Sequence, residues 1–170
     1  MAKERLGWGL TWPISSILIM ILFVSSAVAG ESDSFDKLLG AWRGSGQVTF
    51  VDGQPESIRC NAYYTRAERS LRFAIRCASS SGSGIEVRGV LSQDKEIILG
   101  TWEERTLNTS GDAKGRVAGN KIALSISGGG VIGSMSVSVD GPTQVLVMMV
   151  VAISTKDVKM KSANITLSKY

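Results

Sequence analysis

The sequence predicts an all-β protein, an antiparallel up-and-down meander of about eight to ten strands that closes into a barrel. Apolar and polar residues alternate with a period of two in successive segments. Turn signals recur about every 8–12 residues, and no helical period beyond residue 38 lasts longer than about two turns. Because an open meander has two unpaired edges, closure into a barrel is the most complete way to protect them.

The chain divides into three predicted parts: a signal peptide at residues 1–29, a flexible leader at residues 30–37 and a single β-barrel domain at residues 38–170. Lys3 and Arg5 precede an apolar stretch at residues 14–24, and Ala27 and Ala29 fit the small-x-small cleavage rule. We therefore expect cleavage after Ala29 and export of the protein. The alternative is an uncleaved N-terminal anchor, but the apolar stretch is shorter than the ~20 residues needed to span a bilayer.

The predicted strands follow one another with short connections. In order, they cover residues 38–51, 56–64, 71–79, 85–91, 97–106, 113–118, 122–127, 131–139, 144–153 and 158–169. Glycines bend the first strand, and turns are expected at Asp52-Gly53, Gln93-Asp94, residues 108–111, Gly119-Asn120, residues 128–130 and residues 140–142. The ninth strand is continuously apolar rather than alternating, and a break is expected in the last strand near Ser162.

The only two cysteines of the chain, Cys60 and Cys77, lie in neighbouring predicted strands. A turn centred on residues 68–69 places them opposite each other, and the same register pairs Ala62 with Ile75 and Tyr64 with Phe73 on one apolar face. A redox pair or metal site is the alternative, but there is no C-x-x-C motif, and a metal site would need more soft ligands than these two cysteines. An isolated pair in an exported domain predicts a structural disulfide.

Several catalytic chemistries are disfavoured. The chain contains no histidine, which excludes Ser-His-Asp and Cys-His catalysis and the commonest metal ligand. Glu103 and Glu104 are adjacent in a strand and point to opposite faces, so they do not form an acid–base pair. The glycines at residues 128–130 have no lysine or helix behind them, which argues against a phosphate loop. We predict a non-enzymatic protein without metal or cofactor.

Binding of a hydrophobic or amphipathic small molecule inside the barrel is the first predicted function. The inward phase is apolar, and its scattered Gly and Ala residues leave room for a ligand. The candidate ligand-binding residues are the inward aromatic side chains Trp42, Tyr64, Phe73 and Trp102. The alternative is that these aromatic residues only pack the core or a barrel end.

A basic outer surface is the second predicted site. Its candidate residues are Arg59, Arg72, Arg76 and Arg88, on the polar phase of three neighbouring strands. They favour an anionic partner of the cell envelope, such as lipopolysaccharide, phospholipid or an acidic protein, and a protease-inhibitor role belongs to the same class. The alternative is a solvated surface without a partner. The net charge of +4 is spread along the chain, so no nucleic-acid partner is expected.

Two resemblances add to this interpretation. The stretch LLGAWRGSG at residues 38–46 resembles the G-x-W start of calycin and lipocalin barrels, and more closely that of nitrobindin-like barrels; the haem of nitrobindins is not expected here, because the chain lacks histidine. Residues 40–46, 56–64, 71–79 and 100–104 together are similar to a family of small exported proteins of rhizobia and related bacteria, which has no assigned function. This resemblance implies a periplasmic or secreted β-barrel.

Overall fold

The computed structural model describes residues 34–51, 53–153 and 160–170, without the side chains of residues 151–153. The predicted signal peptide, its cleavage site and the first part of the leader lie outside these residues. Ten antiparallel strands follow in chain order: β1 (Gly40–Phe50), β2 (Glu56–Ala67), β3 (Ser70–Ser79), β4 (Gly84–Asp94), β5 (Ile97–Glu104), β6 (Thr109–Ala118), β7 (Lys121–Gly128), β8 (Val131–Asp140), β9 (Thr143–Ile153) and β10 (Met160–Lys169).

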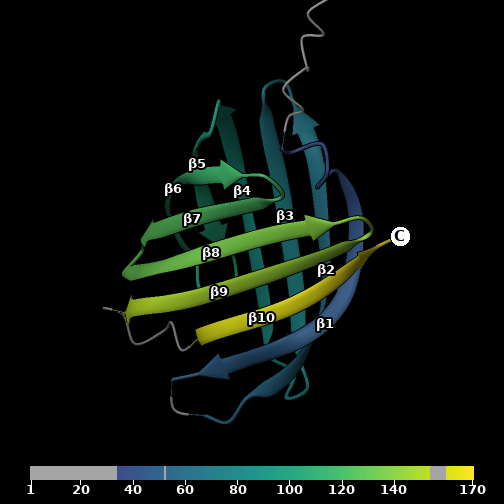
Figure 1. Ribbon diagram of the computed structural model, residues 1–170. Coiled ribbons are helices and arrows are strands. Elements are labelled where there is room, and N and C mark those ends of the chain that lie inside the picture. The colour runs from purple at the N-terminus through teal and green to yellow at the C-terminus, as the bar shows by residue number, and fades with distance from the viewer. Residues whose placement is uncertain (1–33, 52, 154–159) are drawn as a thin grey trace, which may run out of the picture. The chain divides into compact units, whose positions relative to one another are not determined.

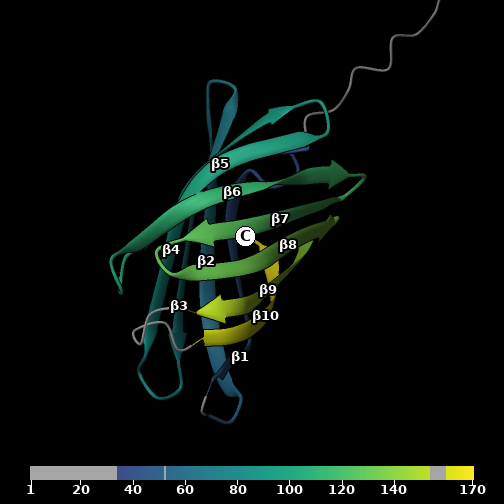
Figure 2. The ribbon, with the colours of Figure 1, turned by 90° about the vertical axis from the view of Figure 1, so that its left-hand side faces the viewer.

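Each strand pairs with its neighbours in sequence, and β1 also pairs with β10, so the meander closes into a barrel. The predicted all-β barrel is thereby confirmed. In Figure 1, β7–β10 cross the long strands β2–β4 at a steep angle, and Figure 2 shows the strands wrapping around a common interior. Within the described ranges, no helix is long and apolar enough to cross a membrane.

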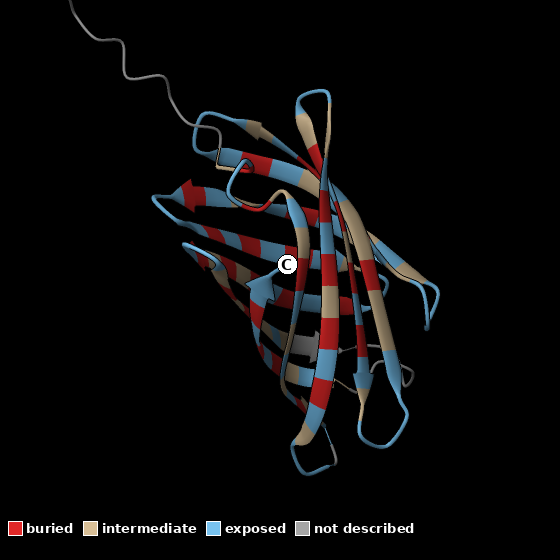
Figure 3. Cartoon of the chain, turned by 90° about the vertical axis from the view of Figure 1, so that its right-hand side faces the viewer, coloured by how far each residue is buried: buried red, intermediate tan, exposed pale blue. Residues whose placement is uncertain are grey.

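The burial of the strands follows their sequence alternation. Buried and exposed residues alternate along most strands (Figure 3), as in β7, where Ile122, Leu124 and Ile126 are buried between exposed neighbours. Burying one phase of every strand gives the barrel a single hydrophobic core. The hydrophobic pattern therefore determines which face of each strand points inward.

The β2–β3 hairpin has the predicted register. Cys60 lies opposite Cys77, Ala62 opposite Ile75 and Tyr64 opposite Phe73. The turn between Ala67 and Ser70 contains Glu68, which adopts a positive φ of 54°. The predicted disulfide is present between Cys60 and Cys77, and both cysteines are buried.

Two predicted turns and one predicted strand break differ from the structure. The turn expected at Gln93-Asp94 lies at residues 95–96, because β4 and β5 stay paired as far as Asp94 and Ile97. The turn expected at residues 108–111 is complete by Asn108, and β6 starts at Thr109. β10 stays continuous near Ser162, where a break was expected, but its pairing with β1 shifts register there, from Thr49 opposite Ser162 to Phe50 opposite Met160.

The described part of the predicted leader belongs to the barrel. Residues 34–38 form a turn that buries Phe35 and Leu38 completely or nearly so. The turn reaches β2, since Asp36 forms an ion pair with Arg66, and its residues border a small gap beside Asn120 of the β6–β7 connection. Apolar burial of Phe35 is worth on the order of 2 kcal/mol, enough to hold a short segment in place. The turn therefore covers one end of the barrel.

Candidate ligand-binding cavity

The interior of the barrel contains a cavity of about 330 Å³ at the end opposite the turn formed by residues 34–38. Its walls are mostly apolar side chains from nearly all strands. At the mouth, it is bordered by residues of the β3–β4 connection, such as Ser83, and of the β5–β6 connection, such as Thr106 and Leu107. The barrel is thus packed at one end and hollow at the other.

Small side chains on β6 explain why the interior is not filled. The inward residues of this strand include Gly111, Ala113 and Gly115, and Ala113 lines the cavity. A Cβ atom on Gly111 would lie 2.0 Å from the carbonyl oxygen of Ser127, so this position admits no larger residue. The cavity therefore forms where β6 contributes little side-chain volume to the core.

The floor of the cavity is aromatic. Phe73 of β3 and Trp102 of β5 flank Gly89 of β4 in adjacent register positions. A Cβ atom on Gly89 would lie 2.5 Å from the ring of Phe73, so the glycine makes room for this ring. The indole Nε1 of Trp102 donates to the carbonyl oxygen of Asp112 at 3.2 Å, which leaves an apolar ring surface toward the cavity.

Three methionines form part of the cavity wall. Met135 of β8 and Met148 of β9 are direct cross-strand partners, and Met160 of β10 lines the same cavity. Methionine is flexible and polarisable, so such a wall adapts to ligands of different shape. The described residues contain no group of three or more His, Cys, Asp or Glu side chains that could hold a metal ion.

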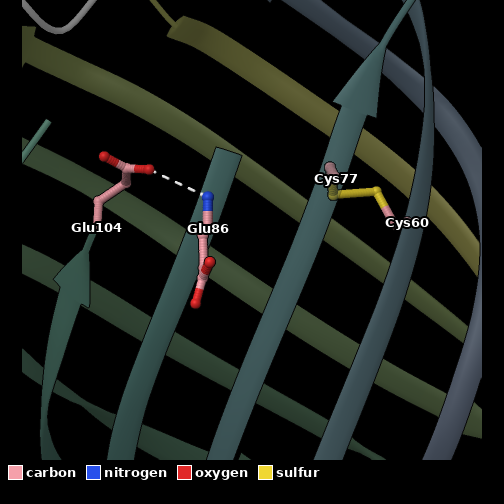
Figure 4. The surroundings of a disulfide bond; sticks show 4 residues. All are labelled: Cys60, Cys77, Glu86 and Glu104. Carbon is pink, nitrogen blue, oxygen red and sulfur yellow. Dashed lines mark hydrogen bonds between the residues drawn. A yellow bond between two sulfur atoms is a disulfide. The ribbon is translucent and has the colours of Figure 1, made fainter. Parts of the chain in front are cut away.

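Glu104 is the only charged side chain among the described residues that line the cavity. One carboxylate oxygen accepts hydrogen bonds from the backbone N–H groups of Glu86 and Thr106, both at 3.1 Å. The other accepts from the backbone N–H of Leu107 at 2.6 Å. Figure 4 shows the Glu104–Glu86 contact between β5 and β4, with the Cys60–Cys77 disulfide on the next two strands, β2 and β3. The carboxylate is therefore held in place at the mouth.

The packed end contains the two other predicted ligand-binding residues. Trp42 is fully buried and its indole Nε1 donates to the carbonyl oxygen of Leu38 at 2.7 Å, which ties β1 to the turn of residues 34–38. The hydroxyl of Tyr64 is 2.6 Å from Nε2 of Gln144, and burial raises the pKa of Tyr64 to about 12. Neither Trp42 nor Tyr64 lines the cavity, whereas Phe73 and Trp102 do.

Sequence reasoning missed several cavity residues, namely Glu104, Ala113, Met135, Met148 and Met160. The alternation of inward and outward residues in β5 could have identified one of them, Glu104. Ile98, Gly100 and Trp102 share the inward phase, and Glu104 continues that phase, whereas Glu103 points outward. A carboxylate on the apolar phase of a strand was therefore visible in the sequence.

The outer face bears the four predicted arginines, but their charge is partly neutralised. Arg76 and Arg88 both contact Glu86, with Nε–Oε1 distances of 3.4 Å and 2.6 Å. Partial desolvation acts to raise the pKa of Glu86, but the hydrogen bond from Arg88 and the charges of Arg76 and Arg88 outweigh it and lower this pKa. Arg59 lies on the same face, near the start of β2.

A hollow of about 690 Å³ lies on this outer face. Arg72 and Arg88 line it from β3 and β4, and Glu103 and Asp112 line it from β5 and β6. The surface that was expected to be basic is therefore a mixed one, with cations and carboxylates on neighbouring strands.

Together, the closed meander and the one-ended apolar cavity define a small β-barrel of the kind that can enclose a ligand. No protein-family model matches the chain, and no curated protein matches it in sequence. Among solved structures, Rv2717c from M. tuberculosis has a TM-score of 0.67 at 15% identity, over 81% of this chain and 95% of that one. The S-type phycobiliprotein lyase CPES from Guillardia theta has a TM-score of 0.60 at 10% identity, over 79% and 89%. At these identities, the similarity concerns the fold.

Proposed function

We propose that this protein is an exported, non-enzymatic β-barrel that binds a hydrophobic or amphipathic small molecule in its cavity, in the periplasm. The observation that carries the proposal is the apolar cavity of about 330 Å³. Ligand cavities of proteins measure about 300–1,000 Å³ and have mostly apolar walls with a few polar groups, as here. The predicted signal peptide and the resemblance to small exported proteins support the compartment.

The size of the cavity argues against a simple packing defect. Protein interiors contain few voids larger than a water molecule. The value measured for closed, empty cavities, about 24 cal/mol per Å³, gives an upper limit of roughly 8 kcal/mol for the packing lost around this open cavity. That is comparable with the whole stability of a typical domain, about 5–15 kcal/mol. A ligand that fills the space would recover part of this loss.

The experiment is a titration with N-phenyl-1-naphthylamine, a neutral apolar fluorophore, read by probe fluorescence and by the tryptophan emission, to which Trp102 contributes. The variant Ala113→Phe places a ring in the cavity and should abolish binding. The control Ala123→Phe adds the same ring at an exposed position of β7 and should bind normally. Equal binding by both variants, or no binding by the unaltered chain, would contradict the proposal.

A second candidate function is binding of an anionic envelope component through the outer face, including a possible protease-inhibitor role. The observation that favours it is the outer hollow, where Arg72 has no carboxylate partner within the described part of the chain. Vesicles containing phosphatidylglycerol should then bind the protein at low salt and release it at high salt. Arg72→Gln should weaken this binding more than Arg116→Gln does, and absence of binding at low salt would exclude it.

A further inference from the structure

We propose that the cavity selects ligands with an uncharged or cationic polar head over ligands with an anionic head, and that Glu104 sets this preference. The inference rests on the proposed function, since it concerns the same cavity. It narrows the ligand from any amphipathic molecule to neutral or cationic amphiphiles such as long-chain alcohols and amines.

The first step of the argument is the charge inside the cavity. Apart from Glu104, the described lining residues are apolar side chains, glycine or hydroxyl side chains such as Ser83, Thr106 and Thr109. No lysine or arginine is among them. Among these described residues, an anionic head would find no cationic partner to replace the water that it loses, which is unfavourable for a buried charge. It would also meet the carboxylate of Glu104, a like charge.

The second step is that Glu104 cannot readily turn away. Its two oxygens accept three backbone hydrogen bonds, from Glu86, Thr106 and Leu107. These bonds connect the side chain to the start of β4 and to the β5–β6 connection, so its position is part of the local fold. A carboxylate has about four acceptor positions, and three are occupied here. One position is left to accept a hydrogen bond from an ammonium or hydroxyl group of a ligand.

The third step is the direction in which such a ligand would lie. The deep part of the cavity presents the rings of Phe73 and Trp102 and the thioethers of Met135 and Met148, which suit an apolar tail. The hydroxyl side chains and Glu104 belong to the loops and strand ends at the mouth. An amphiphile would thus insert its tail first and leave its head beside Glu104.

The test compares decylammonium, decanol and decanoate, which share one chain and differ in the charge of the head, by calorimetric titration of the full chain at neutral pH. We expect decanoate to bind at least tenfold more weakly than decylammonium, a difference of about 1.4 kcal/mol. Glu104→Gln should bring the two affinities within about threefold, since it removes the charge. Glu103→Gln is the matched control, because Glu103 is the adjacent, outward residue with a half-exposed side chain beside Arg105.

The outcomes separate the inference from the proposed function. If none of the three compounds binds, the proposed function fails together with the inference. If all bind and decanoate is equal or tighter, or if Glu104→Gln keeps the selectivity, the inference alone fails. Glu104→Gln also weakens the hydrogen bonds that hold the β5–β6 connection. A second measurement therefore uses the unaltered chain, in which NMR follows the amide resonances of Thr106 and Leu107 during each titration. Decylammonium should shift them more than decanol does, and equal shifts would overturn the inference even where the variant does not fold.

Discussion

Removing the disulfide should cost a large part of the stability of this barrel. Cys60 and Cys77 connect β2 and β3 at directly opposed positions, and both side chains belong to the hydrophobic core. The change to test is the double variant Cys60→Ala with Cys77→Ala, which leaves no thiol behind. Alanine keeps the inward positions apolar, so the variant mainly removes the covalent link.

The expected magnitude follows from the length of chain that the disulfide closes. The two cysteines are 17 positions apart in sequence. In the chain-entropy model, a loop of this size stabilises the folded state by about 3 kcal/mol, because the link restricts the unfolded chain. The typical stability of a domain is about 5–15 kcal/mol, so the variant should still fold at room temperature.

Urea unfolding at equilibrium is the appropriate assay. With an m-value of about 1–3 kcal/mol/M, a loss of 3 kcal/mol lowers the midpoint by about 1–3 M. The m-value itself should rise in the variant, since the unlinked unfolded chain exposes more surface. A loss below about 1 kcal/mol together with an unchanged m-value would refute the reasoning, and so would two free thiols in protein isolated from the exported fraction.

Three further predictions concern the packed end and the strand bends. Trp42→Phe should destabilise the fold by about 1–3 kcal/mol in thermal unfolding, since it leaves the carbonyl of Leu38 without its donor, while cavity binding stays unchanged. Burial raises the pKa of Tyr64 from 10.0 to about 12. The protonated side chain therefore contributes its full stabilisation below about pH 10, and the free energy of unfolding should fall by roughly 3 kcal/mol as the pH rises to about 12. Tyr64→Phe should flatten this decline, and an unchanged slope would contradict it. Gly44→Ala should cost about 3 kcal/mol, because its Cβ would lie 2.0 Å from the carbonyl oxygen of Thr166, whereas Gly84→Ala has space and should cost less than about 1 kcal/mol.

The register of the β2–β3 hairpin could be predicted because two independent patterns agree there. The apolar phases of the two strands match when Tyr64 faces Phe73, and the same alignment brings Cys60 opposite Cys77. A shift by one residue would expose the whole apolar set, so the alternation excludes odd shifts, and the opposed cysteines then select one pairing among the even ones. Closure by β1 and β10 could be predicted only in general terms, as the way to remove two edges.

The cavity could not be predicted in the same way, because its position depends on volumes summed around the whole barrel. Trp42 and Trp102 occur in the same short pattern, L-G-x-W, and both point inward. Trp42 nevertheless packs under the turn of residues 34–38, whereas Trp102 borders empty space. The difference comes from their neighbours: Leu38 of the preceding turn packs against Trp42, whereas the small residue Gly111 of β6 lies opposite Trp102. Local alternation gives the direction of a side chain but not the volume that remains beside it.

The outer arginines show a similar limit. Their outward direction follows from the alternation of β2, β3 and β4, but their net effect depends on Glu86. Glu86 lies opposite Arg76 in the β3–β4 register and two residues from Arg88 on its own strand. Since one carboxylate interacts with both guanidinium groups, the charge available to an anionic partner is smaller than the count of arginines suggests.

The small residues of β6 imply a conflict between stability and binding, which Ala113→Phe can measure. A phenylalanine at this position would bury a ring in space that is otherwise hollow, and full burial of such a side chain is worth about 1.5–3 kcal/mol. If the cavity is maintained for a ligand, Ala113→Phe should raise the free energy of unfolding by about 1–2 kcal/mol while it abolishes uptake of the apolar probe, as expected where function requires space that stability does not. Urea unfolding of this variant and of Ala123→Phe provides the comparison, because the exposed ring of the control should change stability by no more than about 0.5 kcal/mol. A variant that loses stability along with binding would show instead that Ala113 is small because the barrel wall has no room for a ring, and the cavity would then be a consequence of strand packing.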